Sequence, residues 1–344
     1  MGNEQQSRNA NGKQKANSKK RKQRNKIILI VVELIVLAIL AVVLYGISKL
    51  EKIERPDNQA MEQVEKNEDI EEEVLEVMNQ FRTIAVFGLD NRSNGNLDSG
   101  NSDVIIVVSI DNETQEVKMC SVFRDTYLDI GGGKFRKCNA AFSKGGPQAA
   151  ISMLNKNLDL NITDYVTVDF NAVVECIDLL GGIDIELTEA EAEYLNEDDF
   201  WVYQDVQPGM AHLDGMTALC YARMRKAKGD SDSDIIRTSR QRKVILTIIE
   251  KLKTLSIPEI QAIVNEVLPM VITSMDNREI TDMVLKLLPI LPELSIDPNG
   301  TCPVNHWGEM VDIYSDGMYH SVLRFDPYET KRNMRQITEG EIPE

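Results

Sequence analysis

Histidine and cysteine are scarce in this sequence, which restricts the chemistry that it can support. The three histidines, His212, His306 and His320, lie far apart, and the five cysteines contain no close pair. Because zinc sites are built from clusters of these ligands, a zinc centre is not expected. The odd number and wide spacing of the cysteines give no basis for assigning a disulfide, and a small buried thiol is the simplest interpretation of most of them.

The motifs of familiar hydrolases and nucleotide-binding proteins are also missing. The sequence contains no Gly-x-Ser-x-Gly elbow and no phosphate loop that ends in Gly-Lys-Ser or Gly-Lys-Thr. Nucleophilic catalysis of the familiar hydrolase kind is therefore poorly supported. The remaining chemical groups are carboxylates at predicted strand ends and clustered arginines, which together are suited to phosphoryl transfer through charge neutralisation.

A long apolar stretch near the N-terminus predicts a membrane anchor. Residues 27–47 are interrupted only by Glu33 and Tyr45, and about 20 apolar residues are enough for a helix to cross a bilayer. Every charged residue of segment 1–26 except Glu4 is basic, so this tail is expected in the cytoplasm and the remainder outside. A cleaved signal peptide is the alternative, but the apolar stretch is long for one.

The predicted organisation has four parts. A basic cytoplasmic tail (1–26) and a transmembrane helix (27–47) are followed by an acidic stalk (48–80) and an extracytoplasmic domain (81–340). Strands are expected at 83–89, 104–110, 117–122, 165–169, 183–187, 293–296 and 321–326, and helices at 147–158, 171–180, 233–253, 257–274 and 278–290. This alternation predicts an α/β fold, a three-layer α/β/α sandwich around a mixed central sheet, preceded by one transmembrane helix.

The charge of the chain makes two basic segments informative. The formal net charge is −17, and the part after the basic tail is more acidic still. Such a domain is not expected to bind nucleic acid through its general field. Against this background, segments 220–225 and 237–242 gather arginines. Because guanidinium groups match phosphate oxygens in a bidentate manner, a concentrated phosphate anion is the simplest reason for such a cluster.

Two aspartates and an arginine stand beside predicted strands. Asp90 follows one buried strand directly, Asp103 precedes the next, and Arg124 comes just after a third. Ligands of open α/β sheets bind at strand ends, and two hard carboxylates suit Mg²⁺, which keeps places for phosphate oxygens. Each aspartate could instead cap a turn, and the residues alone leave both interpretations open.

The spacing of the other basic residues indicates which of them share a face. Arg223 and Arg225 are two positions apart, so in an extended segment both point the same way. Arg237, Arg240 and Gln241 stand at i, i+3 and i+4 on the predicted helix and share one face. A single surface arginine is usually just a solvated charge, but several at strand ends and on helix faces favour a binding site.

The ordered set of motifs resembles the LytR-CpsA-Psr family over about residues 81–255. Asn101, Phe123 and Cys138 depart from the residues more usual at their positions, and the acidic run 229–234 is longer than typical. The motifs that carry the resemblance are Gly88-Leu89-Asp90-Asn91-Arg92, Asn101-Ser102-Asp103, Arg124-Asp125-Thr126-Tyr127, Lys137-Cys138-Asn139-Ala140-Ala141-Phe142 with Gly145-Gly146-Pro147, Leu179-Leu180-Gly181-Gly182-Ile183, and Tyr221-Ala222-Arg223-Met224-Arg225 through Arg237 to Arg240-Gln241.

The resemblance implies a cell-envelope phosphotransferase. Such an enzyme moves a glycopolymer (teichoic acid, capsule or similar) from an undecaprenyl-pyrophosphate carrier to peptidoglycan. It implies Mg²⁺, with Mn²⁺ as the alternative, held by Asp90 and Asp103. The implied catalytic residues are these two aspartates with Arg124, Arg223 and Arg225, and the implied substrate-binding residues are Arg92, Lys137, Arg237, Arg240 and Gln241. Of these, Arg240 could instead serve helix packing or an ion pair.

Three other functions stay open on the sequence. A hydrolase would use the same residues and pass the phosphoryl group to water. A membrane-bound transcriptional attenuator is a second alternative, although segment 1–26 holds no helix-turn-helix and its basic character is explained by membrane topology. A scaffold that binds the lipid carrier without chemistry is the third.

Overall fold

The computed structural model describes residues 64, 70–90, 100–197, 205–225, 227, 233–293, 301–302, 308–315, 318–325 and 330–331. The predicted basic tail, the transmembrane helix 27–47, most of the stalk and Arg92 lie outside these residues. Among the residues that the structure describes, no helix is long and apolar enough to span a membrane. The chain divides into two units, 1–52 and 53–344, and everything described below belongs to the second.

A mixed six-stranded sheet lies at the centre of this unit. β1 (Phe81–Leu89) pairs antiparallel with β2 (Ser102–Asp111) and parallel with β6 (Asp164–Asp169), and its β-branched and aromatic residues favour a strand. Side chains on both of its faces are buried, which explains its near-continuous apolar sequence. In spatial order the strands are β10 (Thr301–Cys302), β3 (Val117–Val122), β2 (Ser102–Asp111), β1 (Phe81–Leu89), β6 (Asp164–Asp169) and β9 (Val271–Thr273).

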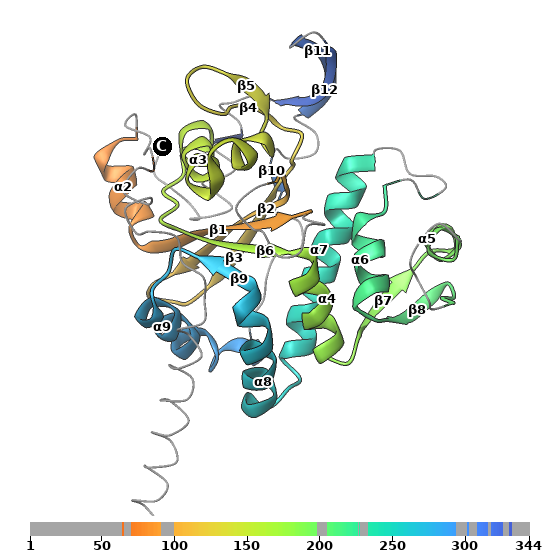
Figure 1. The fold of residues 1–344 in the computed structure, drawn as a ribbon. Helices are drawn as coiled ribbons and strands as arrows, with labels where there is room; N and C mark the ends of the chain where they lie inside the picture. The colour runs from red at the N-terminus through yellow and green to blue at the C-terminus, as the bar shows by residue number, and fades with distance from the viewer. Residues whose placement is uncertain are drawn as a thin grey trace, which may run out of the picture. The chain divides into compact units, whose positions relative to one another are not determined.

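One face of the sheet is covered by α3 (Ala140–Leu158) (Figure 1). Phe142 of α3 packs against Phe87 of β1 with ring centroids 5.3 Å apart, inside the larger hydrophobic core. The helix is broken at Gly145 and Gly146, and Gly146 has a φ of 67°, which favours glycine. The predicted helix start at Pro147 is therefore the start of the second segment of α3.

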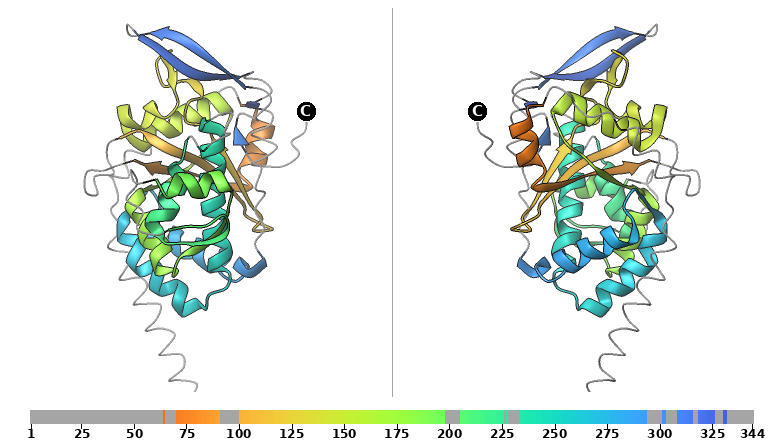
Figure 2. Two further views of the ribbon diagram at one scale, coloured as in Figure 1. Left: turned by 90° about the vertical axis from the view of Figure 1, so that its right-hand side faces the viewer. Right: turned by 90° about the vertical axis from the view of Figure 1, so that its left-hand side faces the viewer.

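A second hydrophobic cluster lies beyond the other face of the sheet, where several helices pack together (Figure 2). Ile177, Leu213 and Tyr221 are buried in it. The elements that contribute to it are α4 (Phe170–Leu179), β7 (Ile183–Leu187), α5 (Glu189–Leu195), β8 (Gly209–Leu213), α6 (Gly215–Arg223) and α7 (Ser233–Leu252).

Two short hairpins lie at the end of the unit that carries α3 (Figures 1 and 2). One joins β4 (Tyr127–Asp129) to β5 (Phe135–Lys137), and the other joins β11 (Gly308–Ser315) to β12 (Met318–Phe325). The amide of Leu323 donates a hydrogen bond of 2.9 Å to the carbonyl of Asp125. This contact attaches the β11–β12 hairpin to the chain just before β4.

The mixed sheet with its helices confirms the predicted α/β class, but one predicted helix is wrong. The segment expected as helix 257–274 contains α8 (Ile257–Val267), the 3₁₀ turn η2 (Leu268–Met270) and strand β9. Pro269 cannot donate a backbone hydrogen bond, and the β-branched residues after it pair with β6. The other described elements are α2 (Glu72–Met78), α9 (Asn277–Leu287) and the turn η3 (Leu291–Glu293).

Several elements were not predicted at all. They are the two hairpin strands β4 and β5, strand β8, helices α5 and α6, and strands β10 and β11. The predicted strand 293–296 is not seen at Glu293, which belongs to η3, and the rest of that segment lies outside the described residues.

Candidate functional site

Asp103 lies at a bulge between β1 and β2. Gly88 pairs with Val104 and Leu89 pairs with Ser102, so Asp103 is an extra residue of β2 with no counterpart on β1. A bulge of this kind bends the strand locally and redirects the side chain of the extra residue. The bulge therefore explains how Asp103, although part of β2, can turn away from the regular alternation of that strand.

Parallel pairing brings two strand ends together at the same edge. Leu89 at the end of β1 lies opposite Asp169 at the end of β6, so Asp90 and Phe170 leave the sheet next to each other. Asp169 caps α4 by accepting a hydrogen bond of 2.9 Å from the amide of Ala172, which orients the start of that helix. Asp90 thus stands where ligands of α/β sheets bind, as predicted.

Helices α6 and α7 supply the basic side chains. α6 ends at Arg223, and Met224 is extended (φ −57°, ψ 127°), so Arg225 leaves the helix before α7 begins. Arg237 and Gln241 are one turn apart on α7 and both are buried. A cavity of about 230 Å³, here called the edge pocket, is lined by Asp90, Asp103 and Phe170 and by Arg223, Arg225, Arg237 and Gln241.

Two ion pairs hold the carboxylates of the edge pocket. Arg223 donates from Nη2 to Asp90 Oδ2 at 3.1 Å, and its guanidinium lies over the ring of Phe170, 5.3 Å from the centroid. Arg124 donates from Nη1 to Asp103 Oδ1 at 2.8 Å, and both of these side chains are mostly buried. Three arginines and two aspartates line the pocket, so its lining has an excess of positive charge in a strongly acidic chain.

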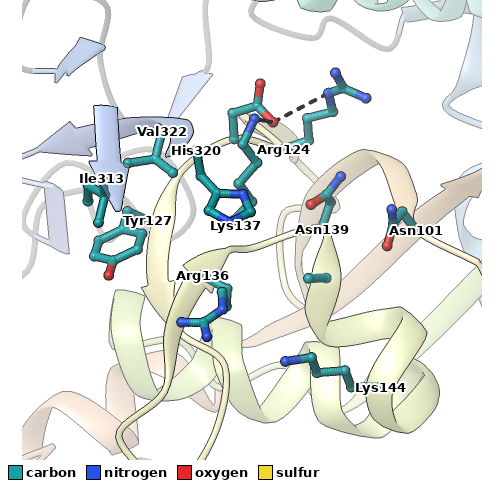
Figure 3. A pocket seen from close by; sticks show the side chains of 12 residues that line it. Asn101, Arg124, Tyr127, Arg136, Lys137, Asn139, Lys144, Ile313, His320 and Val322 are labelled. Atoms are coloured by element: carbon teal, nitrogen blue, oxygen red, sulfur yellow. Dashed lines mark ion pairs between the residues drawn. The ribbon is translucent and has the colours of Figure 1, made fainter. Parts of the chain in front are cut away.

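Arg124 and Lys137 line a neighbouring cavity of about 390 Å³ (Figure 3). The buried Asp125 lies between them, with its Oδ1 3.0 Å from Lys137 Nζ and 3.7 Å from Arg124 Nε. The ion pair between Arg124 and Asp103 connects this cavity to the edge pocket. Of the predicted site residues that the structure describes, all except Arg240 therefore line one of two adjoining cavities.

The turn that carries Arg124 is held by the motif residue Cys138. The Cys138 Sγ lies 3.2 Å from the carbonyl oxygens of both Phe123 and Arg124, which share its single S–H donor, and the Cys138 amide donates a hydrogen bond of 2.8 Å to the carbonyl of Thr126. Burial raises the pKa of the Cys138 thiol, so it stays a protonated donor. Sequence reasoning identified Cys138 only as a departure from the usual residue and did not assign it this positioning role.

Arg240 does not line the edge pocket, which corrects its assignment among the substrate-binding residues. Its Nε lies 2.8 Å from Glu191 Oε1 in a buried ion pair, and its Nη1 donates a hydrogen bond of 3.3 Å to the carbonyl of Met224. Burial opposes the charge of Glu191, but the Thr188 amide and Arg240 together lower its pKa. Arg240 therefore positions the segment between Arg223 and Arg225.

The donor set of the edge pocket limits the metal that it could hold. In the described part of the chain, no group of three or more histidine, cysteine, aspartate or glutamate side chains is placed to bind a metal ion. Asp90 and Asp103 are two hard oxygen donors, which suits Mg²⁺ with phosphate oxygens better than a metal that needs a full protein cage.

Phe170, which also lines the edge pocket, was not predicted as a site residue, since nothing in the local sequence distinguishes it from a core aromatic residue.

Two known proteins, TagV and TagT, show how far the similarity extends. TagV of Bacillus subtilis (strain 168), a polyisoprenyl-teichoic acid–peptidoglycan teichoic acid transferase, is 32% identical over 192 residues, which cover 55% of this chain and 48% of TagV. The chain thus spans about half the length of this relative. The crystal structure of B. subtilis TagV matches with a TM-score of 0.58 and 26% identity, covering 77% of this chain and 99% of that one.

A further solved structure shares the fold. It is the LytR-CPS2A-psr family protein YwtF (TagT) with bound octaprenyl pyrophosphate lipid, matched with a TM-score of 0.54 and 19% identity over 76% of this chain and 92% of that one. The sequence model of the LytR_cpsA_psr family matches residues 41–305, which is well over half of the chain and includes all the motif residues of the edge pocket. This match confirms the resemblance seen in the motifs, and the chain belongs to the LytR_cpsA_psr family.

Proposed function

We propose that this chain transfers a glycopolymer from an undecaprenyl-pyrophosphate carrier to peptidoglycan by phosphoryl transfer. The observation that carries the proposal is the edge pocket, where two carboxylates and three arginines converge at the ends of β1 and β6. Pyrophosphate carries concentrated negative charge, which guanidinium groups match closely. The activity in the name of TagV and the lipid bound in the TagT structure support the same donor and the same reaction class.

In the proposed reaction an acceptor hydroxyl oxygen attacks the phosphorus that bears the glycan. A new phosphorus–oxygen bond forms, the bond to the bridging oxygen breaks, and polyprenyl monophosphate leaves with the electron pair. The hydroxyl proton passes to solvent or to a pocket carboxylate. Negative charge grows on the departing phosphate, and Arg223, Arg225 and Arg237 are placed to stabilise it, with Gln241 as a further donor.

Asp90 and Asp103 are the residues that we propose hold Mg²⁺, with Mn²⁺ as the alternative. Both carboxylates line the edge pocket, and Arg223 and Arg124 neutralise one each, so the site already gathers the two oxygen donors beside cationic groups. Mg²⁺ binds through one or two carboxylates together with substrate phosphate oxygens, which fits this set. When bound, the ion would neutralise charge on the pyrophosphate.

We also propose that the chain is anchored in the membrane by residues 27–47, with the described unit outside the cytoplasm. The basic residues before this apolar segment and the single acid among them support that orientation. An anchored enzyme would meet a lipid-linked donor and a wall acceptor on the same side of the membrane.

The test uses the full chain in detergent micelles with a polyprenyl-pyrophosphate-linked oligosaccharide and peptidoglycan fragments. Release of polyprenyl monophosphate is followed by chromatography, and joined glycan by mass spectrometry, with Mg²⁺ or with a chelator. The expected result is Mg²⁺-dependent release with the sugar phosphate attached to the fragment. Arg225→Ala should abolish both signals, while Arg278→Gln, an exposed change on α9, should leave them intact.

The other outcomes separate the alternatives. Release without joining in the presence of competent acceptors would contradict a transferase and favour a hydrolase. Binding of the lipid without any release would contradict an enzyme and favour a carrier-binding protein. Release that persists in Arg225→Ala would place the chemistry outside the edge pocket.

A further inference from the structure

A second group of basic side chains lies beside the edge pocket and is not used by the proposed reaction. The cavity that holds Arg124 and Lys137 is also lined by Arg136, Lys144 and His320. Beside β4, a cavity of about 560 Å³ is lined by three more basic side chains, Lys156, Arg324 and Lys331. Tyr127 lines both cavities, so the two are neighbours that share an aromatic wall.

One wall of both cavities comes from the β11–β12 hairpin, which follows the end of the family match at residue 305. Ile313 and His320 face each other in the register of the hairpin, and both line the first cavity. Val322 and Leu323 are 1% and 5% exposed, and Leu323 is hydrogen-bonded to Asp125. The hairpin is therefore docked firmly beside Tyr127. Figure 3 shows Ile313, His320, Val322 and Tyr127 grouped beside Arg136 and Lys137.

The basic side chains that line these cavities outnumber the acidic ones. The two cavities are lined by seven lysines and arginines but by only two acids, Asp125 and Asp129. Asp125 pairs with Lys137, and Lys156 pairs with Asp129 at 3.1 Å. Arg124 and Lys331 pair with Asp103 and Asp159, two acids that do not line the cavities. These four cations thus have acidic partners, but in a chain of net charge −17 the excess of cations in the lining still favours an anionic ligand.

The distribution of the cations indicates what kind of anion fits. Arg136 and Lys144 line one cavity and Arg324 lines the other, with Tyr127 between them. A single small anion would contact one side only, whereas a chain with repeated anionic groups would contact both. Tyr127 and the half-exposed Phe135 lie with ring centroids 5.6 Å apart and offer apolar faces on which sugar or polyol units can pack.

We propose that Tyr127 and the two cavities beside it form a basic cleft that binds an anionic glycan through phosphates repeated along its chain. This cleft is separate from the edge pocket and adjoins it through Arg124, which contacts Asp103. The identification of the ligand with the polymer of the lipid-linked donor rests on the proposed function. The cleft would hold the polymer beside the pyrophosphate end that reacts.

The binding test uses the full chain in detergent micelles and a fluorescently labelled, short glycerol phosphate oligomer at low salt. The double variant Arg136→Gln/Lys144→Gln removes two charges from the first cavity, and Arg324→Gln removes one from the second. We expect the double variant to weaken binding about fivefold and Arg324→Gln about twofold, as for partly exposed charge contacts. The matched control is Arg278→Gln/Lys286→Gln, which removes two exposed charges from α9 and should leave affinity unchanged.

Two further ligands identify the source of the anion. A neutral oligosaccharide of the same length should not bind. A muramoyl disaccharide–peptide, which carries carboxylates but no phosphate, should bind more weakly than the oligomer. If the muramoyl fragment binds more tightly and depends on the same residues, the assignment to phosphate is wrong and the cleft belongs to the acceptor.

The outcomes keep this inference apart from the proposed function. Arg225→Ala should lose transfer but retain oligomer binding. Absence of transfer by the unaltered chain would contradict the proposed function, while cleft-dependent binding would still support the cleft. If the α9 control weakens binding as much as the cleft variant does, the attraction is non-specific and the inference is overturned. The inference is also overturned if neither variant changes the affinity for the oligomer. Thermal melting of each variant checks that these substitutions, at exposed positions except for the half-buried Arg136, leave the fold intact.

Discussion

The edge pocket and the basic cleft lie side by side but are built in different ways. The edge pocket is formed by the ends of long strands and helices, and its charged groups include buried Arg237 and the mostly buried pair Arg124–Asp103. The cleft is formed largely by two short hairpins, with Lys144 and Arg324 exposed. The difference is the one expected between a site that fixes reacting atoms and a surface that retains a chain.

The same contrast separates what each arginine can contribute. Arg223 contacts both Asp90 and the face of Phe170, so its guanidinium has little freedom before a ligand arrives. Arg324 lies on an edge of a two-stranded sheet and lines an open cavity. Fixed donors lower a barrier without reorganisation, whereas mobile surface charges contribute mainly to affinity at low salt. Substitutions in each region test this difference between the two sets of charges.

The largest expected effect is loss of catalysis from the edge pocket. Asp103→Asn removes the carboxylate charge of the extra residue in the β2 bulge, and Arg225→Ala removes a proposed phosphate contact. Each is expected to lower kcat/KM for polyprenyl phosphate release at least about a hundredfold, as for other preorganised charge-stabilising groups. The assay is initial-rate release at subsaturating donor. A loss no larger than that of Arg136→Gln/Lys144→Gln would show that the two regions do not differ in role.

The second effect is on stability and comes from the buried ion pair between Glu191 and Arg240, which contacts the segment between Arg223 and Arg225. Glu191→Gln leaves Arg240 buried without its carboxylate partner, which should lower the free energy of unfolding by about 3 kcal/mol. Because the folded-state pKa of Glu191 is below its ordinary 4.5, the pair stabilises the fold above that value, and this stabilisation is lost as the pH falls through the lower folded value. Urea denaturation at pH 7 and below pH 4.5 measures the loss of stability in the variant and the pH dependence of stability in the unaltered chain.

In the Glu191→Gln variant the decrease in stability below pH 4.5 should be smaller than in the unaltered chain. The matched change Glu193→Gln, on the same short helix, should leave both the stability and its pH dependence nearly unchanged. A Glu191→Gln variant as stable as the unaltered chain would show that Arg240 finds another partner.

Much of the edge pocket could be predicted because its residues obey local rules. Asp90 follows a strand, and Arg237 and Gln241 are one helical turn apart, so the sequence places each of them without knowledge of distant contacts. Arg240 satisfies the same spacing and still points elsewhere. Its partner Glu191 belongs to α5, an element that the sequence did not reveal, and a buried ion pair depends on that long-range contact. The arginine spacing therefore predicts a helix face more reliably than it predicts a ligand.

The cleft could not be predicted for the opposite reason. Strands β4, β5 and β11 are short or lie late in the chain, and the hairpins meet only through pairing across a long sequence separation, as between Thr126 and Leu323. The bulge at Asp103 is similarly invisible, because a one-residue shift in register leaves no local signal in an apolar strand. Contacts between distant segments decide both features.

The third prediction concerns Cys138, which belongs to the turn shared by both regions. Cys138→Val keeps an apolar side chain but removes the hydrogen bonds to the carbonyls of Phe123 and Arg124. Loss of this donor should lower the free energy of unfolding by about 1 kcal/mol, and it should raise the KM for the donor more than it lowers kcat. Thermal melts and kinetics measure these effects. Cys176→Val on α4 is the control, and it should not alter KM.

The smallest effect separates the two regions by salt. Surface charges are screened strongly as ionic strength rises, whereas mostly buried pairs such as Arg124–Asp103 are screened much less. Raising the salt concentration from about 0.01 M to 0.15 M should weaken oligomer binding several-fold, because the Debye length falls from about 30 Å to about 8 Å. The kcat for a short donor that cannot reach the cleft should change less than twofold. Equal salt dependence of the two quantities would mean that the edge pocket is as open to screening as the cleft, and the contrast drawn from burial would fail.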